Sequence, residues 1–285
     1  MIWALLAAHC VAIAALPMLG RRSGRSALLV GAVPAALTMI WAVGRLGAGE
    51  PAASQATWVA GLDLVIRFQI DELAALLTVL VSGIGALVFI YAAGYFGPDA
   101  SGVGRFASTL LAFSAAMVGL VWADTVWTLF VFWELTSITS FLLVGHKNTD
   151  AGARLAARRA LMITAAGGLA MLAGLLVLVD EAGSASLSEL VPVDGSGAHV
   201  AAVLLLVAAA TKSAQVPFHI WLPGAMAAPT PVSAYLHSAT MVKAGVVLVA
   251  VVSPALADVG TWKPLGLAFG FASMIWGAVG ALRHN

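Results

Sequence analysis

The stretch AHVAAVLLLVAAATKSAQVPFHIWLPGAM, residues 198–226, decides how this chain folds. Its first thirteen residues, 198–210, carry no charge and only one polar side chain, His199. About 20 apolar residues in a helix cross a hydrocarbon layer of ~30 Å, so the stretch is typical of a membrane helix. Lys212 and Pro217 stand inside it, and a charge and a helix breaker at that depth need a physical reason.

The composition of the whole chain points to the same environment. Of its 285 residues, 61% are hydrophobic and 9% are charged, and the mean hydropathy is +1.00. A water-soluble domain cannot bury so much apolar surface, so we expect an integral membrane protein. The net charge of +1 gives no reason to expect nucleic-acid binding. The single cysteine, Cys10, excludes an intrachain disulfide and a cysteine metal cluster, and we expect no cofactor and no metal site.

Apolar runs long enough to cross a membrane predict an all-α, polytopic protein with about nine transmembrane helices. Connections longer than a short turn are expected at 44–72 and 180–199, and neither is long enough to hold a soluble domain of any size. The predicted helices cover residues 1–19, 27–44, 73–95, 106–122, 125–145, 158–179, 200–226, 232–252 and 265–282.

The basic residues predict the orientation, because cytoplasmic connections accumulate Lys and Arg. The odd-numbered connections hold nine of them and the even-numbered connections hold three. The first apolar run has no basic residue before it, so we expect a retained helix rather than a signal peptide, with the N-terminus extracytoplasmic. The nine are Arg21, Arg22, Arg25, Arg105, Lys147, Arg154, Arg158, Arg159 and Arg283, and the three are Arg45, Arg67 and Lys263.

Three ionisable residues stand at membrane depth. Glu134 lies ten residues after Asp124, which is about 15 Å along a helix, and Lys212 and Lys243 lie within their apolar runs. A charge facing lipid at the centre costs about 2.5–3.5 kcal/mol on insertion scales, so these groups must face protein or water. His237 precedes Lys243 by six residues, too far round the helix for a direct pair. Asp124 itself is expected at the start of a helix, at headgroup level.

Pro217 explains the position of Lys212. Its ring removes a backbone donor and clashes with the carbonyl of Ser213, so the helix is expected to break just after Lys212. Unpaired backbone at this depth is tolerated only inside protein or beside a wet cavity. We therefore interpret the stretch as one station of a proton path. The alternative is structural: a Glu134–Lys212 pair that only locks two helices together, and a His237 that is a hydrogen-bonded core residue.

Three motifs carry a family resemblance: FWELTSITSFLLVG at 132–145, TKSAQVPFHIWLPGAM at 211–226 and APTPVSAYLHSATMVKAG at 228–245. Together they resemble the proton-translocating antiporter family, which includes membrane-arm subunits of respiratory complex I and the Mrp-type multisubunit cation/proton antiporters. Related complex I subunits typically have Asp where this chain has Gly224 and no lysine where it has Lys243. The chain is therefore more similar to the A subunits of Mrp antiporters, in their N-terminal portion.

The resemblance implies a core of inverted five-helix repeats, each with one broken helix. Residues 1–105 would form three N-terminal helices, 106–252 one complete repeat with 200–226 as its broken helix, and 253–285 the ninth helix, at the start of a second repeat. Family members continue beyond that point, so we expect this chain to be a portion of a longer subunit. The resemblance also implies a proton pathway through Glu134, Lys212, Lys243 and His237, with the helix break at Pro217.

Two functions follow from the resemblance. The first is a subunit of a hetero-oligomeric antiporter in the plasma membrane, which exchanges Na⁺ or another monovalent cation for protons and is not an enzyme. The alternative is a proton-pumping membrane-arm subunit of a NADH:quinone oxidoreductase or a related membrane-bound hydrogenase. A purely structural scaffold is a third interpretation. The residues contain no cysteine cluster, Gly-rich nucleotide loop or paired haem histidines, so we expect no redox cofactor in this chain in any of these cases.

Overall fold

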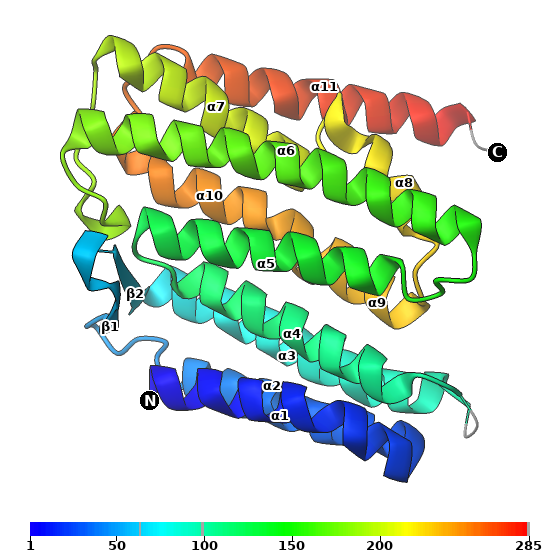
Figure 1. Ribbon diagram of the computed structural model, residues 1–285. Coiled ribbons are helices and arrows are strands. Elements are labelled where there is room, and N and C mark those ends of the chain that lie inside the picture. The colour runs from blue at the N-terminus through cyan, green and yellow to red at the C-terminus, as the bar shows by residue number, and fades with distance from the viewer. Residues whose placement is uncertain (63, 98–99, 284–285) are drawn as a thin grey trace.

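A computed structural model describes residues 1–62, 64–97 and 100–283. Long helices run side by side across the molecule, and a small pair of strands lies at one end of the bundle (Figure 1). The helices are α1 (Ile2–Ser23), α2 (Ala27–Val43), α3 (Glu72–Tyr95), α4 (Val103–Trp122), α5 (Val126–Val144), α6 (Ala151–Ala182), α7 (Ser196–Lys212), α8 (Trp221–Ala225), α9 (Thr230–Ala234), α10 (Met241–Leu256) and α11 (Trp262–Arg283).

The expectation of a helical, multi-pass membrane protein is confirmed. Seven helical stretches within the described residues are long and apolar enough to cross a membrane. One of these stretches, Ile2–Val43, contains both α1 and α2. The first part of the broken helix, α7, is also apolar but is shorter than the seven stretches. The count of about nine crossings is consistent with this arrangement and stays a prediction.

Helices α4 and α6 begin earlier than their apolar runs, in segments that contain arginine. α4 begins at Val103 and α6 at Ala151, so Arg105 and Arg154 lie inside helices and not in connections. The Asp150 side chain accepts a hydrogen bond from the backbone N–H of Gly152 and caps α6. Charged residues end an apolar run, but they do not end a helix, because arginine is a good helix former. Hydropathy therefore marks the membrane-embedded part of these helices and misses their polar ends.

The connection at 44–72 contains a β-hairpin that the all-α prediction missed. Strands β1 (Ala52–Val59) and β2 (Leu64–Ile70) pair antiparallel, and Phe68 and Ile70 of β2 point into the core. The segment LVIRFQI has the β-branched and aromatic residues that fit a half-buried strand. It is too short and too polar to register as an apolar run.

Arg67 of β2 ties the hairpin to the other connections at the same end of the bundle. Its Nε lies 2.9 Å from Oδ2 of Asp124, and its Nη1 lies 3.0 Å from Oε1 of Glu189. Asp124 also accepts hydrogen bonds from the backbone N–H and the hydroxyl of Ser188, at 2.9 and 3.1 Å. Asp124, just before α5, thus clamps the even-numbered connections together, while α1, α3 and α5 end toward the opposite end of the bundle (Figure 1).

Replacing Arg67 with Ala should destabilise the protein. Asp124 is almost fully buried, and removing its cation leaves a desolvated carboxylate that keeps only its serine hydrogen bonds. We expect the free energy of unfolding to fall by about 1–3 kcal/mol, measured as a lower melting temperature in detergent. Lys263→Ala is the control, because Lys263 is an exposed basic residue at the same end. Equal melting temperatures for both variants would contradict the clamp.

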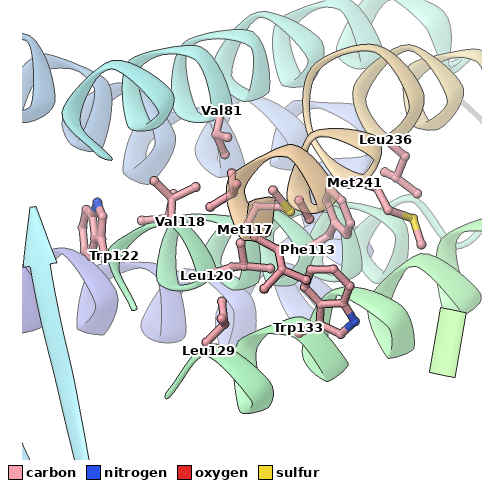
Figure 2. Close-up of a cluster of buried hydrophobic side chains, with 14 of the residues drawn as sticks. Val81, Phe113, Met117, Val118, Leu120, Trp122, Leu129, Trp133, Leu236 and Met241 are labelled. Atoms are coloured by element: carbon pink, nitrogen blue, oxygen red, sulfur yellow. The ribbon is translucent and has the colours of Figure 1, made fainter. Parts of the chain in front are cut away.

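The core between α4, α5 and α10 is apolar and closely packed. Figure 2 shows Phe113 and Met117 of α4, Trp133 of α5 and Met241 of α10 gathered in one cluster. All four side chains are buried. Trp133 is therefore held in place by its neighbours, and the residue after it, Glu134, is half-buried.

Candidate functional site

The helix predicted at 200–226 is broken, as Pro217 indicates. α7 ends at Lys212, and a short 3-10 turn and α8 follow after Pro217. Ala214 in the break has a positive φ of 51°. The backbone N–H of Gln215 still bonds the carbonyl of Ala210, and the indole N–H of Trp221 donates to the carbonyl of Thr211 at 3.0 Å. These contacts satisfy backbone groups that a break would otherwise leave unpaired inside the bundle.

The helix expected at 232–252 is also irregular, which is a correction. α9 passes into a π-helical turn at Tyr235–Ala239 before α10 begins at Met241. The Tyr235 hydroxyl donates to the backbone carbonyl of Val81 and lies 2.9 Å from the hydroxyl of Ser114. These anchors on α3 and α4 hold the turn in place. π-helical turns often occur at functional sites, and this one contains His237.

Lys212 is fully buried, with 0% of its side chain exposed. Its Nζ donates hydrogen bonds to the hydroxyl of Ser137 at 2.8 Å and to the backbone carbonyl of Trp133 at 3.2 Å. It also lies 4.9 Å from the centroid of the Trp133 ring, which is within range of a cation–π contact. Three neutral groups of α5 therefore surround the ammonium group at the end of α7.

Glu134 lies next to this site, and its carboxylate makes no direct ion pair with Lys212. The ion pairs found between described residues both involve Arg67. Glu134 is half-buried, and its Oε1 is a buried atom without a hydrogen-bond partner in the described part of the chain. Such an atom is costly to leave unpaired, which suits a carboxylate that takes up a proton or contacts a group outside this chain.

Two glycines of α6 make room for this arrangement. A Cβ at Gly168 would overlap the Glu134 carboxylate, and a Cβ at Gly167 would overlap the side chain of Thr211, the neighbour of Lys212. α6 therefore passes close to both the carboxylate on α5 and the end of α7. A larger residue at Gly168 would displace the Glu134 carboxylate from its present position.

His237 lies against the other side of the break. The centroid of its ring is 5.8 Å from that of Trp221, and its two ring nitrogens are buried without a hydrogen-bond partner in the described residues. Since Trp221 also bonds the carbonyl of Thr211, one indole connects the end of α7 with His237. Within the described part of the chain, His237 is therefore not the hydrogen-bonded core histidine of the structural alternative.

Lys243 faces away from this group. It is exposed on the surface of α10, while Lys212 is enclosed. The residues next to the two lysines are in contact. The Ser213 hydroxyl, after Lys212, donates a hydrogen bond to the backbone carbonyl of Val242, before Lys243, at 2.7 Å. An exposed lysine at membrane depth needs a polar or hydrated neighbour outside the described residues, since facing lipid is costly.

The structure thus brings Glu134, Lys212 and His237 around the break and places Lys243 on an outer face. Sequence reasoning did not single out Gly168, Trp221 or Trp133. The signal for Gly168 was the Gly167–Gly168 pair in the middle of an apolar run, because a helix interior disfavours glycine. Trp133 contacts Lys212 through its backbone carbonyl, and Trp221 contacts Thr211 through its indole N–H. Such contacts leave no pattern in a sequence.

Comparison with known families identifies the family of this chain. Residues 123–285 match the family described as NADH:quinone oxidoreductase/Mrp antiporter, TM. Residues 57–107 match the family described as NADH-Ubiquinone oxidoreductase (complex I), chain 5 N-terminus. The first match covers more than half of the chain, so the chain belongs to the NADH:quinone oxidoreductase/Mrp antiporter transmembrane family.

Individual relatives indicate the Mrp branch. The chain is 42% identical over 233 residues to the A subunit of the Na(+)/H(+) antiporter of Alkalihalophilus pseudofirmus, a match that covers 80% of this chain and 29% of that protein. It is 47% identical over 231 residues to the A/B subunit of a probable K(+)/H(+) antiporter of Rhizobium meliloti, covering 79% of this chain and 23% of that protein. The chain therefore spans less than a third of the length of these relatives.

Solved structures show the same fold. The Mrp complex from Dietzia sp. DQ12-45-1b contains a chain 40% identical to this one, with a TM-score of 0.88 over 97% of this chain and 31% of that chain. A chain of an archaeal membrane-bound sulfane sulfur reductase matches with a TM-score of 0.75 at 20% identity, over 92% of this chain and 54% of that chain. The second likeness shows a shared fold only.

Proposed function

We propose that this chain is part of the A subunit of a multisubunit monovalent cation/proton antiporter, and that it carries protons near the membrane midplane. The observation that carries the proposal is Lys212, an enclosed ammonium group at the end of a broken helix beside an unpaired carboxylate. A purely structural lysine would be expected to pair directly with a carboxylate, because a buried unpaired charge is strongly destabilising. A lysine held by neutral groups can lose its proton without breaking an ion pair.

In this proposal Lys212 is the group that switches, and Glu134 controls its charge. Protonation of Glu134 or its movement toward another group changes the field at Lys212, and the ammonium group then releases or takes up a proton. His237 and Lys243 relay protons onward. A cavity of about 310 Å³ lies beside the break between α7, α10 and α11, and Ser213 and Gln215 are the polar side chains of its mostly apolar lining.

The proposal includes the parts of the assignment that rest on the relatives. The division into residues 1–105, 106–252 and 253–285 belongs to it, with 106–252 as one repeat. The proposal also includes other subunits of the complex as partners and Na⁺ or another monovalent cation as substrate. It further includes a plasma-membrane location and the absence of enzyme activity. Relatives named for Na⁺ and for K⁺ both match at similar identity, so the cation has to be measured.

The deciding experiment is cation-dependent proton movement in everted vesicles that contain the whole complex. A pH gradient is imposed by ammonium diffusion, without an electron donor, and Na⁺, K⁺ or Li⁺ is then added. We expect at least one of these cations to collapse the gradient, and vesicles without the complex to show no such effect. Proton movement that ignores cations and requires NADH or another electron donor would contradict exchange and support the redox-driven alternative.

The proposed orientation gives a separate prediction. Nine basic residues lie in the odd-numbered connections or in the helix ends beside them, so reporters fused after Arg25 and after Lys147 should report the cytoplasm. A reporter after Glu189, in the clamped end of the bundle, should report the outside. Alkaline phosphatase and a fluorescent protein read the two sides independently. An extracytoplasmic signal after Lys147 would overturn the N-out orientation and leave the transport proposal untouched.

A further inference from the structure

A cavity of about 580 Å³ lies at the end of the bundle opposite the Arg67 clamp. The first turns of α4 and α6 and the last turn of α5 enclose it, so it sits where three spanning helices leave the membrane. Its volume is in the range of small-ligand sites in proteins. The transport proposal uses none of its residues.

Three arginines line this cavity: Arg105 of α4, and Arg154 and Arg158 of α6. Among the described residues, no acidic side chain lines the cavity. The two ion pairs of the described residues both involve Arg67, at the other end of the bundle. The Arg154 guanidinium donates a hydrogen bond to the carbonyl of Asn148 at 2.6 Å, which fixes it at the rim. Three arginines around one cavity, with no acidic residue among its described lining, favour an anionic ligand.

His146 also lines the cavity, and the positive charges around it affect the pKa of its imidazole. It lines the same space, and burial together with the positive charges of Arg105 and Lys147 lowers the pKa of its imidazole. The imidazole is therefore mostly neutral near pH 7, and the arginines supply the positive charge. The positive charge that lines the cavity therefore comes from its arginines.

The remaining wall is apolar. Phe141 and Leu142 of α5 line the cavity on the side that continues into the membrane, and Leu142 is 50% exposed. A soluble anion would leave this wall in contact with water. A phospholipid satisfies both parts, because its phosphate meets the guanidinium groups while its acyl chains follow the apolar wall.

We propose that the cavity binds an anionic phospholipid, with the phosphate held by Arg105, Arg154 and Arg158 and an acyl chain lying against Phe141 and Leu142. Guanidinium groups bind phosphate oxygens through paired, charge-assisted hydrogen bonds. Basic pockets between transmembrane helices are a recurring form of lipid headgroup site. The proposal requires only that the chain spans a membrane, and its failure would leave the transport function as it stands.

The test uses the assembled complex in a neutral detergent, titrated with fluorescent phosphatidylglycerol and phosphatidylcholine. Replacing Arg105, Arg154 and Arg158 together by Gln should weaken phosphatidylglycerol binding by about ten-fold or more and leave phosphatidylcholine binding unchanged. The matched control replaces Arg21, Arg22 and Arg25, three arginines at the same end of the bundle that do not line the cavity. The control should bind phosphatidylglycerol within about two-fold of the parent.

Three results would overturn the proposal. An equal loss in the control would show general attraction to interfacial charge, with no defined site. Full displacement of phosphatidylglycerol by inorganic phosphate would show that the ligand is a soluble anion and that the apolar wall contributes nothing. If the triple variant does not assemble, Arg158→Gln alone should weaken phosphatidylglycerol binding by about two-fold or more, and unchanged binding in that variant would contradict the site.

Discussion

Lys212→Ala should abolish cation-dependent proton exchange at every pH tested, down to the level of vesicles without the complex. The ammonium group is fully enclosed, and its partners are the Ser137 hydroxyl and the Trp133 carbonyl. No other basic side chain is within hydrogen-bond reach of these two groups in the described residues, so none can take its place. Alanine leaves a cavity that cannot carry a proton.

Lys243 supplies the matched comparison. It is exposed on α10 and lies outside the enclosed group around Lys212, so a relay role requires only a titratable group there. Lys243→His should retain part of the exchange activity, with a pH profile shifted toward lower pH because imidazole has a lower intrinsic pKa than an amine. Exchange is measured in everted vesicles against the amount of assembled complex. Equal and complete loss at both positions would leave the two roles without support, and full activity in Lys212→Ala would refute the site.

Gly168→Ala should reduce exchange by about ten-fold to a hundred-fold, although Gly168 lies on α6 and carries no charge. A methyl group at this position overlaps the Glu134 carboxylate, which must then turn away from its place beside Lys212. Alanine is intrinsically the better helix former by about 1 kcal/mol, so a loss of activity would not reflect a weakened helix. Glu134→Ala should abolish exchange while the complex still assembles.

Gly174→Ala is the control for this prediction. Gly174 lies on the same helix, and a Cβ there would press on Leu205 of α7 at 2.9 Å without touching Glu134. It tests the cost of crowding between α6 and α7 alone, and we expect it to retain most of the exchange activity. A loss as large as that of Gly168→Ala would assign the effect to helix packing. Normal exchange in Glu134→Ala would show that the carboxylate does not control Lys212.

The membrane helices were predictable because hydropathy and length are strong constraints in lipid. The broken helix at 200–226 was predictable for the same reason, since Pro217 and Lys212 conflict with a continuous apolar span. The hairpin at 52–70 was not found because pairing between strands depends on residues of two segments and gives only a weak pattern in each. The helical starts of α4 and α6 were misplaced because a charge ends an apolar run without ending a helix.

The candidate site was predictable in its charges and not in its geometry. Glu134, Lys212 and Lys243 stood out because charge is costly at membrane depth. Their relation to one another depends on side-chain direction, and Lys243 proved to face outward while Lys212 is enclosed. The π-helical turn around His237 was hidden, because it results from Tyr235 reaching α3 and α4, which lie more than a hundred residues earlier in the sequence.

The enclosure of Lys212 has a consequence for the tightness of the membrane. A protein that couples two ion gradients wastes energy if protons leak across it on their own. With none of its side chain accessible, Lys212 cannot exchange protons with bulk water on either side until a neighbouring group moves. Under the proposed function, this conformation would hold the proton on Lys212, and exchange would begin when the contacts with Ser137 and Trp133 are broken.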